Sequence, residues 1–415
     1  NAGELKDRLW PLDLIPRIIS LNKWEIVECG LSQRVKALNL FINDVYNKQE
    51  FLDKNPVLKD LILDSPNFLS ECMGISPKNK VWSNICGTDL IRNHNGNFFV
   101  LEDNLRVPSG VAYMLENRNI MKRVIPELFN SYEVNPVDDY PSQLYQCLCD
   151  ASFSNNQKKT IVVLTPGVFN SAYFEHSYLA QQMGVELVEA SDLYVSRSGN
   201  VLMKTINGPK KIDVIYRRVD DIYLDPKTWL KNSTLGIPGI YKSWKSKKIA
   251  IVNAPGSGVA DDKAVYAYVP KMIKFFLNER PIISQVKTYV CAIKKDLDYV
   301  VNNIDQLVLK PVNESGGYGI LIGAQSSKSE LKEYKLKIIN NPRNFVAQPL
   351  IKLSTAPTLI GKNIVPRHLD LRPFILSGKK SFVTKGGLTR VAMKKGSTIV
   401  NSSQGGGSKD TWIAD

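Results

Sequence analysis

The stretch GTDLIRNHNGNFFVLEDNLRVPSG, residues 87–110, decides the fold that this sequence predicts. Apolar residues lie on both sides of Asn95-Gly96, and Asn-Gly between two apolar runs is the strongest short signal for a β-hairpin. A two-residue turn at Asn95-Gly96 would place Asp89 directly opposite Glu102 on the neighbouring strand. The sequence therefore predicts two carboxylates that face each other across a strand pair.

Two facing carboxylates repel each other, so the pairing is unfavourable unless a cation lies between them. Asn104 follows Glu102 by two residues and shares its face of the strand. Carboxylate and amide oxygens suit Mg²⁺, which takes few protein ligands and completes its shell with water or phosphate oxygens. The hairpin alone leaves two alternatives open, a magnesium site formed by Asp89, Glu102 and Asn104, or a surface hairpin with solvated acids.

The composition is that of an ordinary soluble globular protein of two or three domains. The chain has 415 residues, of which 43% are hydrophobic and 23% are charged. The sequence contains no apolar run of membrane-spanning length and no recognisable signal peptide. We therefore expect a cytoplasmic protein that does not bind a membrane.

The net charge of +14 fits a nucleic-acid binder, a membrane-surface protein or an enzyme with an anionic substrate. The lysines are scattered rather than gathered in one basic stripe, so a lysine-rich solvated surface is favoured over nucleic-acid binding. The six cysteines lack zinc-ligand spacing, which predicts buried free thiols and suits a reducing compartment. The three histidines are far apart in sequence and give little support to a histidine metal site or catalytic triad.

A second motif, VLKPVNESGGYGILIG, spans residues 308–323. A buried strand carries Lys310, and the run of residues 315–319 contains three glycines that allow backbone N–H groups to approach an anion. A phosphate is the expected ligand, although a glycine-rich hairpin beside an ordinary lysine is the alternative. The chain contains no Walker A pattern, so the P-loop class is disfavoured. Asp262-Lys263, after a Pro/Gly loop, adds a helix start from which Lys263 could reach an anion.

The elements predicted from the hydrophobic pattern fall into three sections. Residues 1–80 are expected to be largely helical and to be followed by the hairpin and a helix. Strands alternating with a helix then predict a small parallel α/β domain at about residues 158–255. The remainder contains a helix, the strand of Lys310, and the strands expected in FVAQPLI, LDLRPFIL, SFVTKGGLTRVAM and STIVNSSQGGGS.

These motifs together resemble the ATP-grasp carboxylate–amine ligases, with the segments in a circularly permuted order. The matching parts are Asp262-Lys263, Lys310-Pro311, the glycine-rich loop, VAQPLI, Asp370-Leu371-Arg372, NSSQGGG, and Asp89 with EDNLRVPSG. Longer strings, including VLEDNLRVPSGVAYMLENR and TPGVFNSAYFEHSYLAQQMGVELVE, are similar to the circularly permuted ATP-grasp type 2 proteins, often labelled glutathionylspermidine-synthase-like.

The resemblance implies an α+β fold, a circularly permuted ATP-grasp with an inserted small parallel α/β domain like a pre-ATP-grasp domain. It divides the chain into a helical and metal-binding part (1–155), a small α/β substrate domain (156–255), a nucleotide-binding subdomain (256–345) and a second ATP-grasp subdomain (346–415). Residues 87–110 should then pack against residues 365–412 in one antiparallel sheet.

The activity that the resemblance implies is ADP-forming ligation of a carboxylate to an amine through an acyl phosphate, which gives an amide or peptide bond. ATP and Mg²⁺ would be required, and the substrates would be small molecules or peptides. The alternatives are an ATP-dependent phosphotransferase and a non-catalytic nucleotide-binding scaffold. The motifs identify neither the substrate pair nor the oligomeric state.

The resemblance also implies roles for individual residues. Asp89, Glu102 and Asn104 would bind the metal. The nucleotide would be bound by Lys263, Lys310, Ser315, Gly316, Gly317, Tyr318 and Gly319 at the phosphates, and by Gln348, Pro349 and Leu350 at the adenine. Arg372 and Arg390 would join Lys310 in catalysis by stabilising the acyl phosphate, and Arg217, Arg218, Asn401, Gly405 and Gly406 would contact substrate.

Two of these assignments have alternatives. Arg372 could instead form an ion pair with a nearby acid, and Arg217 and Arg218 could pair with Asp220 or Asp221. The chain also departs from many ATP-grasp ligases, which carry an arginine just before the metal aspartate. Here the sequence is CGTDL, so another arginine must serve.

Overall fold

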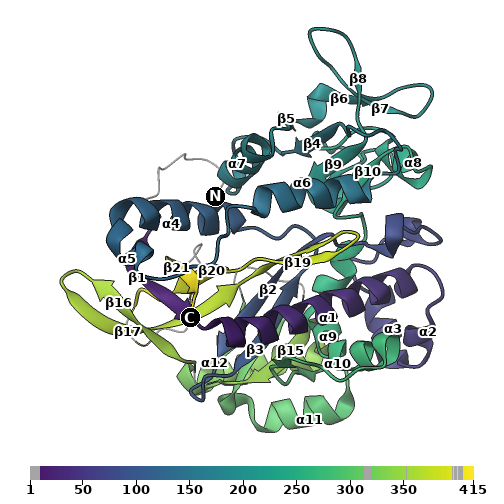
Figure 1. Ribbon diagram of the computed structural model, residues 1–415. Helices are drawn as coiled ribbons and strands as arrows, with labels where there is room; N and C mark the ends of the chain where they lie inside the picture. Colours follow the sequence, from purple (N-terminus) through teal and green to yellow (C-terminus); the bar gives the residue numbers. More distant parts are fainter. Residues whose placement is uncertain (1–9, 313–318, 352, 395, 397–399, 401–404) are drawn as a thin grey trace.

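The computed structural model describes residues 10–312, 319–351, 353–394, 396, 400 and 405–415. A large sheet lies at the centre of the molecule, between helices on both of its faces (Figure 1). Its described strands run in the order β1-β21-β20-β17-β2-β18-β19, with β3 paired to β2, β11 to β3 and β16 to β17. Their bounds are β1 Leu12–Ile19, β2 Ile85–Arg92, β3 Phe98–Asn104, β11 Ser284–Gln285, β16 Thr355–Ile360, β17 Asn363–Arg372, β18 Phe374–Ser377, β19 Ser381–Val383, β20 Leu388–Val391 and β21 Gly407–Ile413.

The α-helices of the described chain differ greatly in length. They are α1 Leu21–Val45, α2 Glu50–Asp53, α3 Pro56–Leu63, α4 Val111–Val124, α5 Pro126–Asn130, α6 Tyr140–Ala151, α7 Tyr173–Met183, α8 Ile240–Lys245, α9 Lys263–Tyr266, α10 Val269–Met272, α11 Lys294–Asn302 and α12 Lys328–Asn340. Among the residues that the structure describes, none of these helices combines the length and the apolar character that a membrane span needs. All six cysteines are unpaired, and Cys29 is exposed where a buried thiol was expected.

The two ends of the chain build the central sheet together. β2 pairs antiparallel with β17 through Leu90 and Leu371, and with β18 through Gly87 and Phe374. This confirms the prediction that residues 87–110 and 365–412 share one antiparallel sheet. β1 lies parallel to β21 at the edge, so the first 80 residues are less helical than predicted. No local pattern marks β1 as a strand, because its partner lies almost 400 residues away in sequence.

Helix α1 covers one face of the central sheet with an apolar stripe. Leu31, Val35, Leu38 and Ile42 recur at helical spacing and are all buried. Gly30 allows this close packing, because a Cβ at that position would lie 2.8 Å from the Cγ2 atom of Ile283. The helix is therefore fixed against the sheet by shape as well as by apolar contact.

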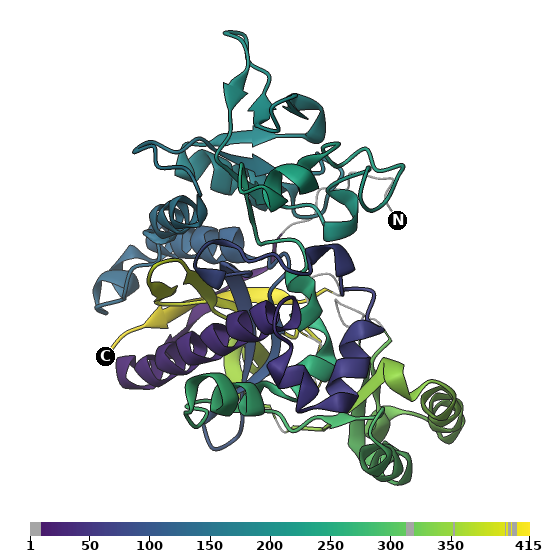
Figure 2. The same ribbon diagram turned by 90° about the vertical axis from the view of Figure 1, so that its right-hand side faces the viewer.

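Helices α4 and α6 lie on the other face, between the central sheet and a smaller parallel sheet (Figures 1 and 2). The smaller sheet has the order β10-β9-β4-β5, with β4 Ile161–Leu164, β5 Glu186–Val188, β9 Val214–Arg217 and β10 Ala250–Val252. Its described pairs are all parallel, as predicted for residues 158–255. Leu144 of α6 belongs to a hydrophobic core that also holds Val163 of the parallel sheet and Phe374 of the central sheet.

Two further sheets complete the described structure. The strands β6 Leu193–Val195, β7 Val201–Met203 and β8 Lys210–Lys211 project from the parallel sheet at the top of Figure 1. The strands β12 Tyr289–Val290, β15 Phe345–Pro349, β13 Leu307–Pro311 and β14 Leu321–Ile322 form an antiparallel sheet near α11 at the bottom. Residues of α11 and α12 pack on that sheet around Leu309 and Ala347. Lys310 lies next to the C-terminal end of β13, where it pairs with Val346 of β15.

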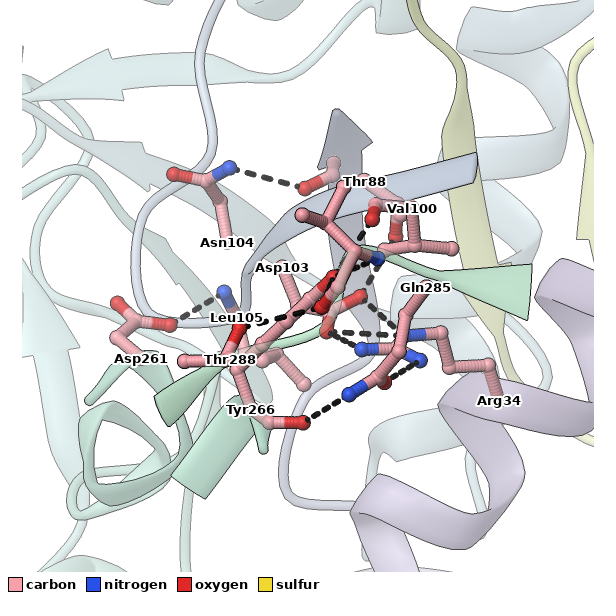
Figure 3. Close-up of polar contacts among 12 residues, drawn as sticks. Arg34, Thr88, Val100, Asp103, Asn104, Leu105, Asp261, Tyr266, Gln285 and Thr288 are labelled. Carbon is pink, nitrogen blue, oxygen red and sulfur yellow. Dashed lines mark hydrogen bonds and ion pairs between the residues drawn. The ribbon is translucent and has the colours of Figure 1, made fainter. Parts of the chain in front are cut away.

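A buried ion pair fastens α1 to the hairpin strand β3 (Figure 3). The Nε and Nη2 atoms of Arg34 donate to both oxygens of Asp103 at 2.7–2.9 Å, and its Nη1 atom donates to Gln285 at 2.8 Å. Thr88 of β2 also donates its hydroxyl to Asp103 at 3.2 Å. The pair therefore joins α1, β2, β3 and β11.

We predict that Arg34→Met destabilises the protein by about 3–5 kcal/mol, because it leaves the Asp103 carboxylate buried without its cation. Urea denaturation of the two proteins measures the difference. The double variant Arg34→Met/Asp103→Leu should recover a large part of the loss, since it removes both charges. A loss for Arg34→Met below 1 kcal/mol would contradict this account of the ion pair.

Candidate functional site

The register of the β2–β3 hairpin confirms that Asp89 faces Glu102. The predicted two-residue turn is nevertheless wrong. Arg92 pairs with Phe98, the backbone N–H of Asn93 donates to the carbonyl of Asn97 at 3.0 Å, and the loop is one residue longer than predicted. A bulge between the Leu90 and Asp89 pairs then shifts the register back by one residue.

The sequence predicts that a metal cation between Asp89 and Glu102 relieves their repulsion. In the structure, two arginines already neutralise Asp89. Arg372 donates from Nε and Nη2 to its two carboxylate oxygens at 2.5 and 2.8 Å, and Arg390 donates from Nη2 at 2.7 Å. Burial by itself would raise the pKa of Asp89, but the two guanidinium groups outweigh it and hold the pKa well below its usual range. The charge of Asp89 is therefore balanced without a cation between the strands.

Arg372 and Arg390 belong to one buried network in the central sheet. Arg390 also donates from Nε to Asp370 at 2.9 Å, and its Nη2 forms a further short contact with the same carboxylate. Arg372 donates from Nη1 to the carbonyl oxygen of Ser109 at 3.2 Å. The ion-pair alternative for Arg372 is thus the observed arrangement, and both arginines are engaged by carboxylates.

A polar cleft lies beside this network, between the hairpin strand β3 and the sheet that carries Lys310. Among the residues that line it are Glu102, Asn104, Arg106, Asp261, Lys263, Lys310 and Gln348. The cleft therefore brings together predicted metal ligands and predicted phosphate-binding lysines from distant parts of the chain.

Lys310 is the most enclosed cation in the cleft, with 8% of its surface exposed. Burial lowers its pKa to about 8, an effect that Glu102 opposes and Lys263 reinforces. Among the residues that the structure describes, the Lys310 ammonium has no hydrogen-bond partner. A buried ammonium in this state favours an anionic ligand, which would stabilise its charged form.

The floor of the cleft is held by hydrogen bonds (Figure 3). The Tyr266 hydroxyl donates to the carbonyl of Val100 at 2.6 Å, and the backbone N–H of Leu105 donates to Asp261 at 2.6 Å. Burial raises the pKa of Asp261 to about 6, against the opposing effect of Arg106. Asn104 donates from its amide nitrogen to the carbonyl of Gly87 at 3.2 Å, which leaves its amide oxygen for another partner.

The predicted adenine-binding residues occupy the end of β15. Gln348 is buried and donates from Nε2 to the Thr288 hydroxyl at 2.9 Å, whereas Leu350 is 40% exposed. Lys263 is the first residue of a helix of only four residues, and Asp262 accepts a hydrogen bond from the N–H of Ala264. Any contribution of Lys263 to anion binding therefore comes from its side chain.

The predicted residues Ser315, Gly316, Gly317, Tyr318 and Asn401 lie outside the described part of the chain. Gly319 and Gly405 have positive φ angles of 68° and 89°, which glycine adopts without strain, and Gly406 follows in the same segment.

Arg217 and Arg218 are both buried, and their predicted contact with substrate stays a prediction. Arg217 forms an ion pair with Asp221 at 2.6 Å, the alternative left open by the sequence. Arg218 pairs with Glu175 at 3.0 Å and donates to the Ser109 hydroxyl at 2.5 Å. Arg218 therefore fastens the parallel sheet to the segment that follows the hairpin.

Two cleft residues were missed in the sequence, although both lie inside quoted motifs. Arg106 is two residues after Asn104, and Asp261 is two residues before Lys263. Their closeness to predicted ligands was the available signal. Only the fold shows that the two motifs meet.

Comparison with known proteins gives a consistent result. The family model described as circularly permuted ATP-grasp type 2 matches residues 16–392. An uncharacterized protein of Synechocystis sp. is 50% identical over 414 residues, which cover 100% of this chain and 86% of that protein. A putative glutamate–cysteine ligase 2-2 of Frankia casuarinae is 40% identical over 415 residues, which cover 99% of this chain but 48% of that protein. Among solved structures, a glutathione synthetase-like effector from Globodera pallida in the apo form matches with a TM-score of 0.64 at 12% identity, over 99% of this chain and 92% of that one.

The arginine clamp on Asp89 predicts a pH-dependent contribution to stability. Its folded pKa is depressed, so the contribution is complete above the unfolded pKa of about 4 and is lost as the pH falls below it. We expect Asp89→Asn to cost about 3–5 kcal/mol at pH 7, because it leaves Arg372 buried without a carboxylate. The gap to the unsubstituted protein should narrow by up to about 1.4 kcal/mol per pH unit below pH 4. Urea denaturation at several pH values tests this, and a gap that stays constant from pH 7 to pH 3 would contradict it.

Proposed function

The chain belongs to the circularly permuted ATP-grasp type 2 family, and from this premise we propose that it is an ATP-dependent ligase that joins a carboxylate to an amine through an acyl phosphate. The observation that carries the proposal is the convergence of Glu102, Asn104, Lys263 and Lys310 in one cleft. These residues come from three separate motifs, and their side chains match a nucleotide phosphate chain with its divalent cation.

The donor set fits Mg-ATP in this arrangement. Lys263 and Lys310 would hold phosphate oxygens, and the backbone of residues 348–350 would lie against the adenine. Glu102 and Asn104 would bind the metal through a carboxylate and an amide oxygen. Asp89 could join them as a third ligand through Oδ1, which accepts one hydrogen bond from Arg372, whereas Oδ2 accepts from both Arg372 and Arg390.

Bound ATP supplies the phosphoryl group that converts the substrate carboxylate into an acyl phosphate, which the amine then attacks. The protein contributes positioning and charge compensation rather than covalent chemistry. Lys263 and Lys310 would neutralise the transferring phosphoryl group, while Arg372 and Arg390 would balance the charges of Asp89 and Asp370 beside it.

The names of the relatives do not identify the substrates of this chain. The Frankia protein is named for ligation of glutamate to cysteine, but this chain spans only 48% of its length. We propose a carboxylate and an amine of small-molecule or peptide size, acting in the cytoplasm, and leave the pair to experiment.

A screen of carboxylate and amine pairs for ADP release, with mass spectrometry of the products, tests the proposal. A ligase releases ADP and phosphate only when both substrates are present, and the amide appears in equal amount. Hydroxylamine added with the carboxylate alone should trap the acyl phosphate as a hydroxamate. A phosphotransferase would give a stable phosphorylated product, and a non-catalytic scaffold would bind the nucleotide without releasing ADP.

We predict that Glu102→Gln and Lys310→Met separate the metal from the phosphate contribution. Glu102→Gln should remove most of the increase in affinity that Mg²⁺ gives to a non-hydrolysable ATP analogue, and should leave binding in EDTA unchanged. Lys310→Met should weaken binding about tenfold or more under both conditions, since it removes a buried positive charge.

Calorimetric titration with and without Mg²⁺ measures both effects. The melting temperature of ligand-free Glu102→Gln should stay close to that of the unsubstituted protein, because Glu102 is only partly buried and has no ion pair within 4.0 Å among the described residues. Unchanged Mg²⁺ dependence in Glu102→Gln would remove Glu102 from the metal site.

A further inference from the structure

The buried arginines of the central sheet are already bound by carboxylates, which leaves the cleft short of an available guanidinium. Arg372 and Arg390 contact Asp89 at 2.5–2.8 Å. Arg217 and Arg218 are likewise paired with Asp221 and Glu175. A ligase of the proposed kind builds negative charge on a phosphoryl group, and planar guanidinium matches phosphate oxygens better than ammonium does.

Arg106 differs from these arginines in the way it is held. It lines the cleft together with Asn104, Lys263 and Lys310. Its nearest carboxylate contacts are long, 3.4 Å from Nε to Asp220 and 3.7 Å from Nε to Asp261. About a third of its side chain, 32%, is exposed.

The hydrogen bonds of Arg106 are correspondingly weak. The one side-chain hydrogen bond that it donates to a described residue runs from Nη1 to the Asn67 amide oxygen at 3.4 Å. Most of its donor groups are therefore not committed to the protein. Arg372, by contrast, places three of its donors on protein acceptors.

The surroundings keep Arg106 close to the site, because Asp220 and Asp261 lie 3.4 and 3.7 Å from its Nε atom. Gly258 gives the side chain its room, because a Cβ there would lie 2.9 Å from the Cδ atom of Arg106.

We propose that Arg106 binds the phosphoryl group as it passes to the substrate carboxylate, and so fills the role of the arginine that is missing before Asp89. The inference rests on the proposed ligase function. A carboxylate oxygen forms a bond to the γ-phosphorus, and the bond to the bridging oxygen breaks, so that ADP leaves with the electron pair. The amine then forms the C–N bond, the C–O bond to phosphate breaks, and the departing phosphate takes the proton that the amine loses. Arg106 neutralises the phosphoryl oxygens in both steps.

The central experiment measures binding of inorganic phosphate to the Mg-ADP complex by calorimetric titration. Arg106→Met should bind Mg-ADP within about twofold of the unsubstituted protein, because Lys263 and Lys310 remain. Its affinity for phosphate should fall at least tenfold, and Arg106→Lys should recover only part of it, since lysine cannot form the two-pronged contact. Arg92→Met is the matched control, an arginine of the same hairpin that donates to Gly96 and does not line the cleft.

Two further measurements separate this role from a structural one. Gly258→Ala should mimic Arg106→Met in phosphate binding, because it displaces the arginine without removing it. With a substrate pair from the screen, Arg106→Met should lower kcat at least 100-fold with little change in KM for ATP.

Each adverse outcome points to a single cause. Unchanged phosphate affinity in Arg106→Met would overturn the inference, as would an equal loss of Mg-ADP binding. Phosphate binding that depends on Arg106 in a protein that ligates nothing would retain Arg106 as a phosphate-binding residue but refute the ligase function, and with it the role of Arg106 in phosphoryl transfer.

Discussion

The contact between Asp89 and its two arginines is the interaction on which the arrangement of the molecule depends. β2 and β17 meet through a single register pair, Leu90 and Leu371, so the backbone ladder between the two halves of the sheet is short. The ion pairs from Asp89 to Arg372 and Arg390 reinforce it over a sequence separation of about 280–300 residues. Through the carbonyl of Ser109, the same network reaches the start of α4.

From Ser109 the network continues into the parallel sheet. Arg218 donates to the Ser109 hydroxyl and pairs with Glu175, while Glu175 accepts the backbone N–H groups of Gly110 and Ala112. The positive φ of 115° at Gly110 permits the turn that exposes these N–H groups. One chain of charge-assisted contacts therefore joins the central sheet, α4 and the α/β unit.

Much of the fold could be predicted from the sequence. The strongest signals in the sequence are either local patterns or motifs shared with a known family. The hairpin, the strand of Lys310 and the small parallel sheet are fixed by turn residues and hydrophobic runs. β1 was missed because its only signal is a parallel partner at the far end of the chain. The pairing of Asp89 with Glu102 was predicted correctly, although the predicted turn was wrong. The loop is one residue longer than predicted, and a bulge in the strand pair restores the register; counting residues reveals neither.

The site was harder to predict than the fold, because an arginine can either bind a ligand or neutralise a buried carboxylate. Arginines expected to contact substrate or phosphate proved to be paired with Asp89, Asp370, Asp221 and Glu175. Sequence identifies a guanidinium but not the carboxylate that reaches it through the fold, and a buried carboxylate partner decides whether the group is free to bind a ligand.

Circular permutation leaves this site intact for a physical reason. The cleft is assembled from β3, α9, β13 and β15, and each of these elements is positioned by sheet pairing or by a buried contact rather than by its neighbour in sequence. Moving the chain ends changes loop connections, whose closure entropy varies only slowly with length. The β2–β17 and β13–β15 pairings are unaffected, so the lysines and the hairpin acids keep their relative positions. The same reasoning allows a unit of this length to match about half of a longer protein, as it does in the Frankia relative.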